Sequence, residues 1–75
     1  MTQPLETEYA INRHNQDGDI IDVDHKPTKK AAEKTYKEFE PCGTFHAISV
    51  DKIEWINKNG ERNETETFPM RPDNQ

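Results

Sequence analysis

The sequence predicts an α+β fold in which one helix packs on one face of a four-stranded antiparallel sheet. Residues 27–40 place apolar side chains at helical spacing, whereas most of the remaining chain alternates apolar and polar residues as strands do. Glycine-containing turns at residues 15–18 and 59–60 divide the alternating stretches into two hairpins, one on each side of the helix. The predicted order is therefore β-β-α-β-β.

The first hairpin is predicted between residues 8 and 25, with one strand on each side of the turn. Side chains on alternate positions of a strand share a face, so each strand has a side that can meet the helix. The side chains expected to face the helix are Tyr9, Ile11, Ile21 and Val23. Those expected on the outer side include Ala10, Ile20, Asp22 and Asp24.

The helix is predicted over residues 27–40. Thr28 is suited to the N-cap, because its hydroxyl can accept a hydrogen bond from a free N–H in the first turn. The apolar face consists of Ala32, Tyr36 and Phe39. Pro41-Cys42-Gly43 ends the helix, since proline cannot continue the hydrogen-bond ladder.

The second hairpin is predicted from residues 44 to 68. Ile53 and Trp55 are out of phase with Ile48 and Val50, which indicates a bulge or bend near residues 51–52. Asn59-Gly60 is typical of a two-residue type I′ turn. Such a turn would place Trp55 opposite Glu64 and Ile53 opposite Glu66. The returning strand is nearly all polar, as suits an exposed edge.

A crossover through the helix makes the second and third strands parallel in direction. Placing the third strand beside the first then gives an antiparallel sheet of order 2-1-3-4. Residues 8–68 are predicted to form the single domain. Residues 1–7 and 69–75 are predicted to be disordered tails, because they lack periodicity and contain prolines.

Composition excludes several classes of function. The 75 residues carry 15 acidic and 10 basic side chains, and the net charge of −5 argues against a general nucleic-acid binder. The single cysteine cannot form an internal disulfide. No apolar run is long enough to span a bilayer or to act as a signal peptide. We therefore expect a soluble cytoplasmic protein that does not contact membranes.

Candidate metal sites and catalytic sites are weak. The turn at residues 15–20 has the oxygen-rich pattern of a calcium loop, but Arg13 occupies the position that requires the first carboxylate. Asp22 and Asp24 share a strand face, although no second pair of ligands is visible. Cys42 and His46 form the one nucleophile–base pair that we considered, and a helix C-terminus disfavours the thiolate. We expect no catalytic residue, no metal and no cofactor.

Charged surfaces are the remaining candidates for function. Acidic side chains gather on both hairpins, and apolar residues on an uncovered sheet face would mark a binding or dimer surface. The predicted partner-binding residues are Asp17, Asp19, Ile20, Asp22, Asp24, Glu54, Trp55, Glu64 and Glu66. The expected partner is a host or cognate protein with a basic surface, or a second copy of the chain bound through the open sheet face. Trp55 is the expected anchor.

The run DGDIIDVDHKPTKKAAEKTYKEFE, residues 17–40, resembles a pattern in small proteins encoded by phages and prophages. In these proteins a short hairpin ending in acidic residues leads into a helix opened by Thr-Lys-Lys. The order is also similar to that of the arm-binding domains of phage integrases, which are basic on the sheet that meets DNA. The resemblance implies a small accessory protein that inhibits a host enzyme or defence complex, and it transfers no functional residue.

Two hypotheses therefore stand. The first is a non-enzymatic protein-binding module that occupies a surface of a host protein. The alternative is a small accessory protein that contacts DNA or RNA through the lysine-rich helix. Its expected contact residues are Lys26, Lys29, Lys30, Lys34 and Lys37.

Overall fold

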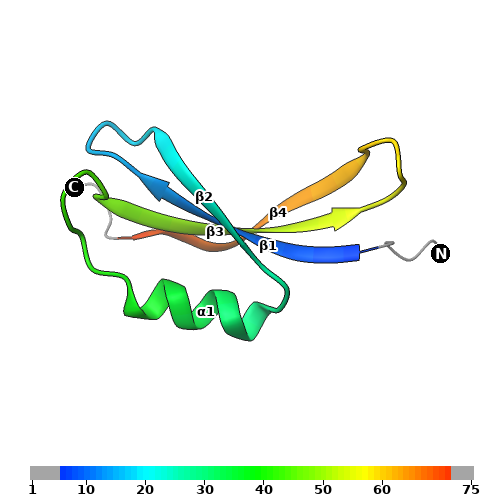
Figure 1. Ribbon diagram of the computed structural model, residues 1–75, viewed down its shortest axis with the longest axis horizontal. Helices are drawn as coiled ribbons and strands as arrows, with labels where there is room; N and C mark the ends of the chain where they lie inside the picture. The colour runs from blue at the N-terminus through cyan, green and yellow to red at the C-terminus, as the bar shows by residue number, and fades with distance from the viewer. Residues whose placement is uncertain (1–5, 72–75) are drawn as a thin grey trace.

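The structure, a computed structural model that describes residues 6–71, confirms the predicted topology. Four antiparallel strands lie in the order β2-β1-β3-β4, and one helix lies on one face of the sheet (Figure 1). The elements are β1 (Glu6–His14), β2 (Ile20–Lys26), α1 (Lys29–Glu38), β3 (Ala47–Trp55) and β4 (Arg62–Arg71). The long axis measures 41 Å, and the turns of the two hairpins lie at its opposite ends (Figure 1).

The helix begins where the sequence predicts. Thr28 is the N-cap, and its Oγ1 accepts a hydrogen bond from the backbone N–H of Ala31 at 3.2 Å. Ala32 is fully buried, while Tyr36 and Phe39 pack beside it against the sheet. The predicted apolar face of α1 is therefore the face that contacts the sheet.

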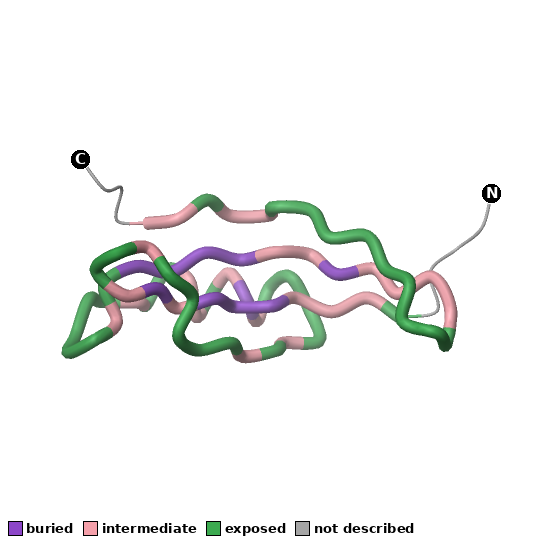
Figure 2. Tube along the Cα trace, turned by 90° about the horizontal axis from the view of Figure 1, so that it is seen from above, coloured by how far each residue is buried: buried purple, intermediate pink, exposed green. Residues whose placement is uncertain are grey.

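The core lies between α1 and the two central strands, where Figure 2 shows most of the buried residues. Ile11 of β1 lies directly opposite Val50 of β3, and both are fully buried together with Ile48. The half-buried side chains that complete this cluster are Tyr9, Tyr36, Phe39 and Phe68. Phe68 stacks on Tyr36 with 4.9 Å between the ring centroids, so β4 also holds the helix.

The predicted orientation of β2 is wrong. The first turn would, with regular pairing, have placed Val23 opposite Ile11, but β2 carries one extra residue between Ile20 and Asp22. This bulge shifts the register, so Asp24 lies opposite Ile11 and Val23 lies opposite Asn12. A shift of one residue turns every following side chain to the other face of the sheet. The carboxylates of β2 therefore face the α1 side, and Val23 does not enter the core.

The predicted bulge in β3 is also wrong. The β1–β3 register is unbroken from Glu6 opposite Trp55 to His14 opposite Ala47. The irregularities lie instead in β4, whose pairing with β3 shifts on both sides of Val50. Regular alternation alone then places Trp55 on the face opposite α1.

The second turn has four residues rather than the predicted two. The N–H of Ile56 donates to the carbonyl of Glu61 at 2.8 Å, and the Asn57 side chain accepts the N–H of Asn59 at 2.8 Å. A type I′ turn requires positive φ at both central residues, whereas only Gly60 has it here. As a result Trp55 pairs with Arg62 and not with Glu64.

The boundaries of the domain extend beyond the prediction at both ends. Glu6 and Thr7 belong to β1, and Pro69–Arg71 belong to β4. The hydroxyl of Tyr36 donates to the carbonyl of Pro69 at 2.8 Å, which ties this segment to the helix. The rest of the predicted tails, residues 1–5 and 72–75, lies outside the described residues.

Candidate protein-binding surface

The outer edge of β2 exposes three aliphatic side chains. Ile20, Ile21 and Val23 are 53%, 43% and 47% exposed, and within residues 6–71 these are the exposed large hydrophobic side chains. β2 is an edge strand that pairs with β1 on one side and with no other strand of residues 6–71. We call this strand and its outward side the β2 edge.

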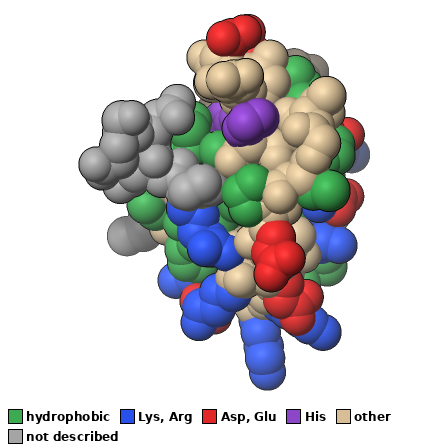
Figure 3. All heavy atoms as spheres, turned by 90° about the vertical axis from the view of Figure 1, so that its left-hand side faces the viewer, with side chains coloured by type: hydrophobic (Ala, Val, Ile, Leu, Met, Phe, Trp, Pro, Cys, Tyr) green, Lys and Arg blue, Asp and Glu red, His purple; other side chains and the backbone are tan. Residues whose placement is uncertain are grey.

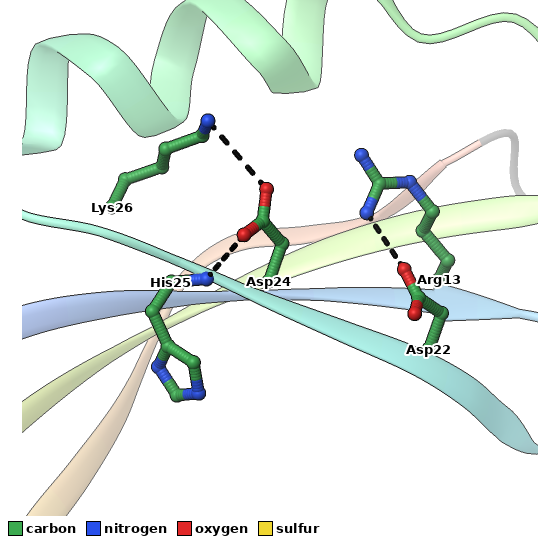
Figure 4. Close-up of polar contacts among 5 residues, drawn as sticks. All are labelled: Arg13, Asp22, Asp24, His25 and Lys26. Atoms are coloured by element: carbon green, nitrogen blue, oxygen red, sulfur yellow. Dashed lines mark hydrogen bonds and ion pairs between the residues drawn. The ribbon is translucent and has the colours of Figure 1, made fainter.

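Two carboxylates lie on the α1 side of the β2 edge, each beside a basic side chain (Figure 4). Asp22 accepts from Arg13 Nη1 at 3.0 Å, and Asp24 lies 3.5 Å from Lys26 Nζ. Both carboxylates are about half exposed, so each ion pair contributes at most about 1 kcal/mol. The residues of β1, β2 and their turn contain six carboxylates and two Lys or Arg side chains, which leaves this hairpin acidic.

Asp24 also covers part of the strand edge. Its Oδ1 accepts the backbone N–H of His25 at 2.9 Å (Figure 4). Desolvation by itself would raise the pKa of Asp24, but the His25 N–H and the positive charges of Lys26 and Arg13 together hold that pKa below its ordinary value. The carboxylate is therefore stabilised in its ionised form.

Two more acidic residues of this hairpin, Asp17 and Asp19, lie in the turn before β2. The Asn15 side chain accepts the N–H groups of Asp17 and Asp19, both at 2.9 Å, and Gly18 adopts a φ of 90°. No ion pair joins Asp17 or Asp19 to another residue in the range 6–71. The turn thus adds two uncompensated carboxylates at the end of the β2 edge.

The other predicted partner-binding residues form a separate group at the far end of the molecule (Figure 1). Trp55 is half-buried beneath Arg62, whose guanidinium lies 5.2 Å from the ring, and Arg62 in turn pairs with Glu64 at 3.1 Å. Glu54 pairs with Lys52 at 3.7 Å, on the opposite sheet face from Trp55. The structure therefore does not unite the nine predicted residues in one site, and the Trp55 ring is partly covered by Arg62.

The sheet face opposite α1 has a polar centre that the sequence analysis missed. His14 donates from Nδ1 to the carbonyl of Gly18 at 3.0 Å, because a carbonyl can only accept. The other ring nitrogen, Nε2, then accepts from the Ser49 hydroxyl at 2.8 Å in the neutral imidazole. Asn12 donates to Ser49 at 3.5 Å and to Asp51 Oδ2 at 2.9 Å.

Ser49, His14 and the Gly18 carbonyl lie in the order of a nucleophile, a base and a group that orients the base. However, Ser49 and His14 are only 8% and 5% exposed, so little of either residue is open to a substrate. The hydrogen bonds of this network satisfy buried polar groups between the central strands. The sequence signal was the alternation of polar residues at Asn12, His14 and Ser49, on the strand face that the helix does not cover.

The five lysines of the alternative hypothesis divide into two groups. Lys30, Lys34 and Lys37 line one open depression of about 460 Å³ on the outer side of the helix. Lys26 is engaged with Asp24, and Lys29 lies 5.9 Å from the Phe68 ring. Figure 3 shows basic side chains gathered at the lower edge, where α1 lies, with acidic side chains among them and a further acidic side chain at the opposite edge.

The candidate nucleophile–base pair and the candidate metal ligands do not come together within residues 6–71. Cys42 is exposed in a tight turn in which its N–H and carbonyl pair with Phe45, and the structure gives no contact between Cys42 and the exposed His46. Among residues 6–71 no group of three or more His, Cys, Asp or Glu side chains could hold a metal ion. No helix in the same range is long and apolar enough to cross a membrane.

Comparison of the chain with protein-family models, with curated proteins and with solved structures gives no match.

Proposed function

We propose that this chain is a small, non-enzymatic, acidic protein-binding module that acts by occupying a surface of another protein. The observation that supports this function is the β2 edge, where three aliphatic side chains remain about half exposed beside unpaired strand backbone. Covering an aliphatic side chain of this kind stabilises a complex by about 1 kcal/mol. The acidic turn next to the edge would favour a partner with a basic surface and accelerate its association.

The resemblance of residues 17–40 to phage-encoded proteins suggests the class of partner. A protein of this type would bind a host enzyme or defence complex and block its surface. The burial of Ser49 supports the non-enzymatic part of the proposal. Labelling of Ser49 by a fluorophosphonate, which reacts with activated serines, would contradict it.

Affinity capture with matched variants tests the binding function. The full chain is immobilised and exposed to lysate of the cell in which it acts, and the captured proteins are quantified by mass spectrometry. The test variant is Ile21→Lys/Val23→Lys, whose positions are exposed, and the control is Thr65→Lys on the exposed part of β4. We expect a stoichiometric protein that the wild type and the control retain and the test variant loses. If every captured protein persists with the test variant, the β2 edge is not the binding surface.

A specific observation also favours the second candidate, contact with DNA or RNA. Lys30 and Lys34 share one face of α1, and no ion pair joins either of them to another described residue. Binding through these charges would weaken steeply with salt. The triple variant Lys30→Glu/Lys34→Glu/Lys37→Glu should abolish it, and the absence of any complex with duplex or single-stranded DNA or RNA at about 50 mM salt would eliminate this candidate.

A further inference from the structure

We infer that the β2 edge binds an extended segment of another protein as a fifth, antiparallel strand, and that this segment alternates basic and apolar residues. The inference rests on the proposed function and specifies its partner and its mode of binding. Main-chain hydrogen bonds would give affinity, and alternate side chains would give specificity.

The backbone of the β2 edge is available for pairing at Val23. The N–H of His25 donates to the Asp24 carboxylate, so it does not point at β1. Because the hydrogen-bonding direction alternates along an antiparallel strand, the N–H and carbonyl of Val23 also point away from β1. A residue placed opposite Val23 on an antiparallel fifth strand can therefore exchange two hydrogen bonds with it.

The side chains of β2 set the sequence of such a strand. Asp22 and Asp24 lie on the α1 side (Figure 4). Val23, which lies opposite Asn12, is on the other side. Directly opposite residues on paired strands share a face, and opposite charges there are favourable. The incoming strand should thus place basic residues opposite Asp22 and Asp24 and an apolar residue opposite Val23.

A second copy of this chain fits the β2 edge poorly in three registers. An isologous antiparallel pairing centred on Asp22 or on Asp24 places that residue opposite itself. Pairing centred on Val23 places Asp22 opposite Asp24 in both halves. Like charges directly opposite each other are destabilising, so these carboxylates disfavour self-pairing in the registers centred on residues 22–24.

The opposite edge of the sheet is less suited to strand addition. The outer half of β4 contains the charged residues Arg62, Glu64 and Glu66. Its inner half contains Pro69, which has no N–H to donate, and two irregularities in its pairing. β2, by contrast, contains no proline and keeps regular pairing with β1 from Asp22 to Lys26.

The probe is a synthetic peptide of seven residues that alternates lysine and valine and is blocked at both ends. It is titrated into the full chain while amide exchange and ¹⁵N chemical shifts are followed. Saturation should slow exchange of the Val23 amide about tenfold or more. N-methylation of the valines should weaken binding about tenfold or more, whereas N-methylation of the lysines should change it less than about threefold.

Charge variants complete the test. Asp22→Asn/Asp24→Asn should weaken binding several-fold, because both charges are lost while the amide oxygen introduced at position 24 can still accept the His25 N–H. Thr65→Lys should leave binding unchanged. Equal weakening by the two N-methylated peptides, or binding without slowed exchange at Val23, would overturn strand addition. If a captured protein nevertheless depends on Ile21 and Val23, the binding function stands and only the mode of binding is wrong.

Discussion

Replacing Arg71 with alanine should remove a large part of the stability of this domain. Arg71 ends β4, and its Nε and Nη2 donate to the carbonyl of Tyr36 at 3.0 and 2.7 Å. Nη2 also donates to the carbonyls of Lys37 at 2.9 Å and Phe39 at 3.2 Å. These carbonyls lie at the C-terminal end of α1, where a helix leaves such groups without an internal partner.

The expected loss follows from these contacts. Hydrogen bonds from a charged donor contribute about 1.5–3 kcal/mol, and a cation at a helix C-terminus adds about 0.3–1 kcal/mol. The guanidinium also lies 5.1 Å from the Tyr36 ring, where a cation–π contact contributes about 0.5–1 kcal/mol. Because Arg71 is partly exposed and these contributions are not additive, we expect a net loss of about 2–3 kcal/mol. A domain of this size has about 4–11 kcal/mol in total.

Urea unfolding followed by far-UV circular dichroism measures this loss. At a slope of about 1 kcal/mol per molar urea, Arg71→Ala should lower the midpoint by about 2–3 M with the slope unchanged. Arg71→Lys should be intermediate, because an ammonium cannot reach all three carbonyls in one geometry. Arg62→Ala is the matched control, since Arg62 covers Trp55 on the exposed part of β4. An Arg71→Ala midpoint within about 0.5 M of the wild type would refute the capping role.

Three further predictions concern the same unfolding free energy. Ser49→Ala should lower it by about 1–3 kcal/mol because the buried Nε2 of His14 loses its partner, whereas Ser49→Thr, which keeps the hydroxyl, should lower it less. Thr28→Ala should lower it by about 1 kcal/mol through loss of the N-cap, and Thr28→Ser should restore most of that. The lowered pKa of Asp24 means that the unfolded chain takes up this proton at a higher pH, so its contribution is present above about pH 4 and is lost on further acidification. Asp24→Asn should therefore slightly reduce the acid-induced loss of stability between about pH 5 and pH 2.5, and an identical loss in both proteins would contradict this.

The sequence was informative where a pattern repeats locally. The spacing of Ala32, Tyr36 and Phe39 and the hydroxyl of Thr28 are properties of one segment, and they predicted the helix and its start. The strand order followed from general rules on crossovers and neighbouring strands. These predictions needed no knowledge of how one segment contacts another.

The register of β2 against β1 could not be predicted in this way, because a single extra residue turns the following side chains of a strand to the opposite face. Nothing at Ile21 marks the bulge, since alternation on both sides of it reads as one continuous strand. The contacts of Arg71 could not be foreseen either, because they join residues more than thirty positions apart. The asparagines that begin both turns, Asn15 and Asn57, were an available signal, since an Asn side chain readily accepts backbone N–H groups in a turn.

The bulge in β2 connects the failed prediction with the proposed function. Without it Val23 would lie against the core opposite Ile11, where burial of its side chain would stabilise the fold by about 1 kcal/mol. With it, the carboxylates of β2 turn toward the α1 side and the aliphatic side chains remain at the edge. An edge strand that exposes apolar side chains invites pairing, and the same carboxylates oppose pairing with a second copy in the registers centred on residues 22–24. The combination fits a strand that is kept available for a different, basic partner.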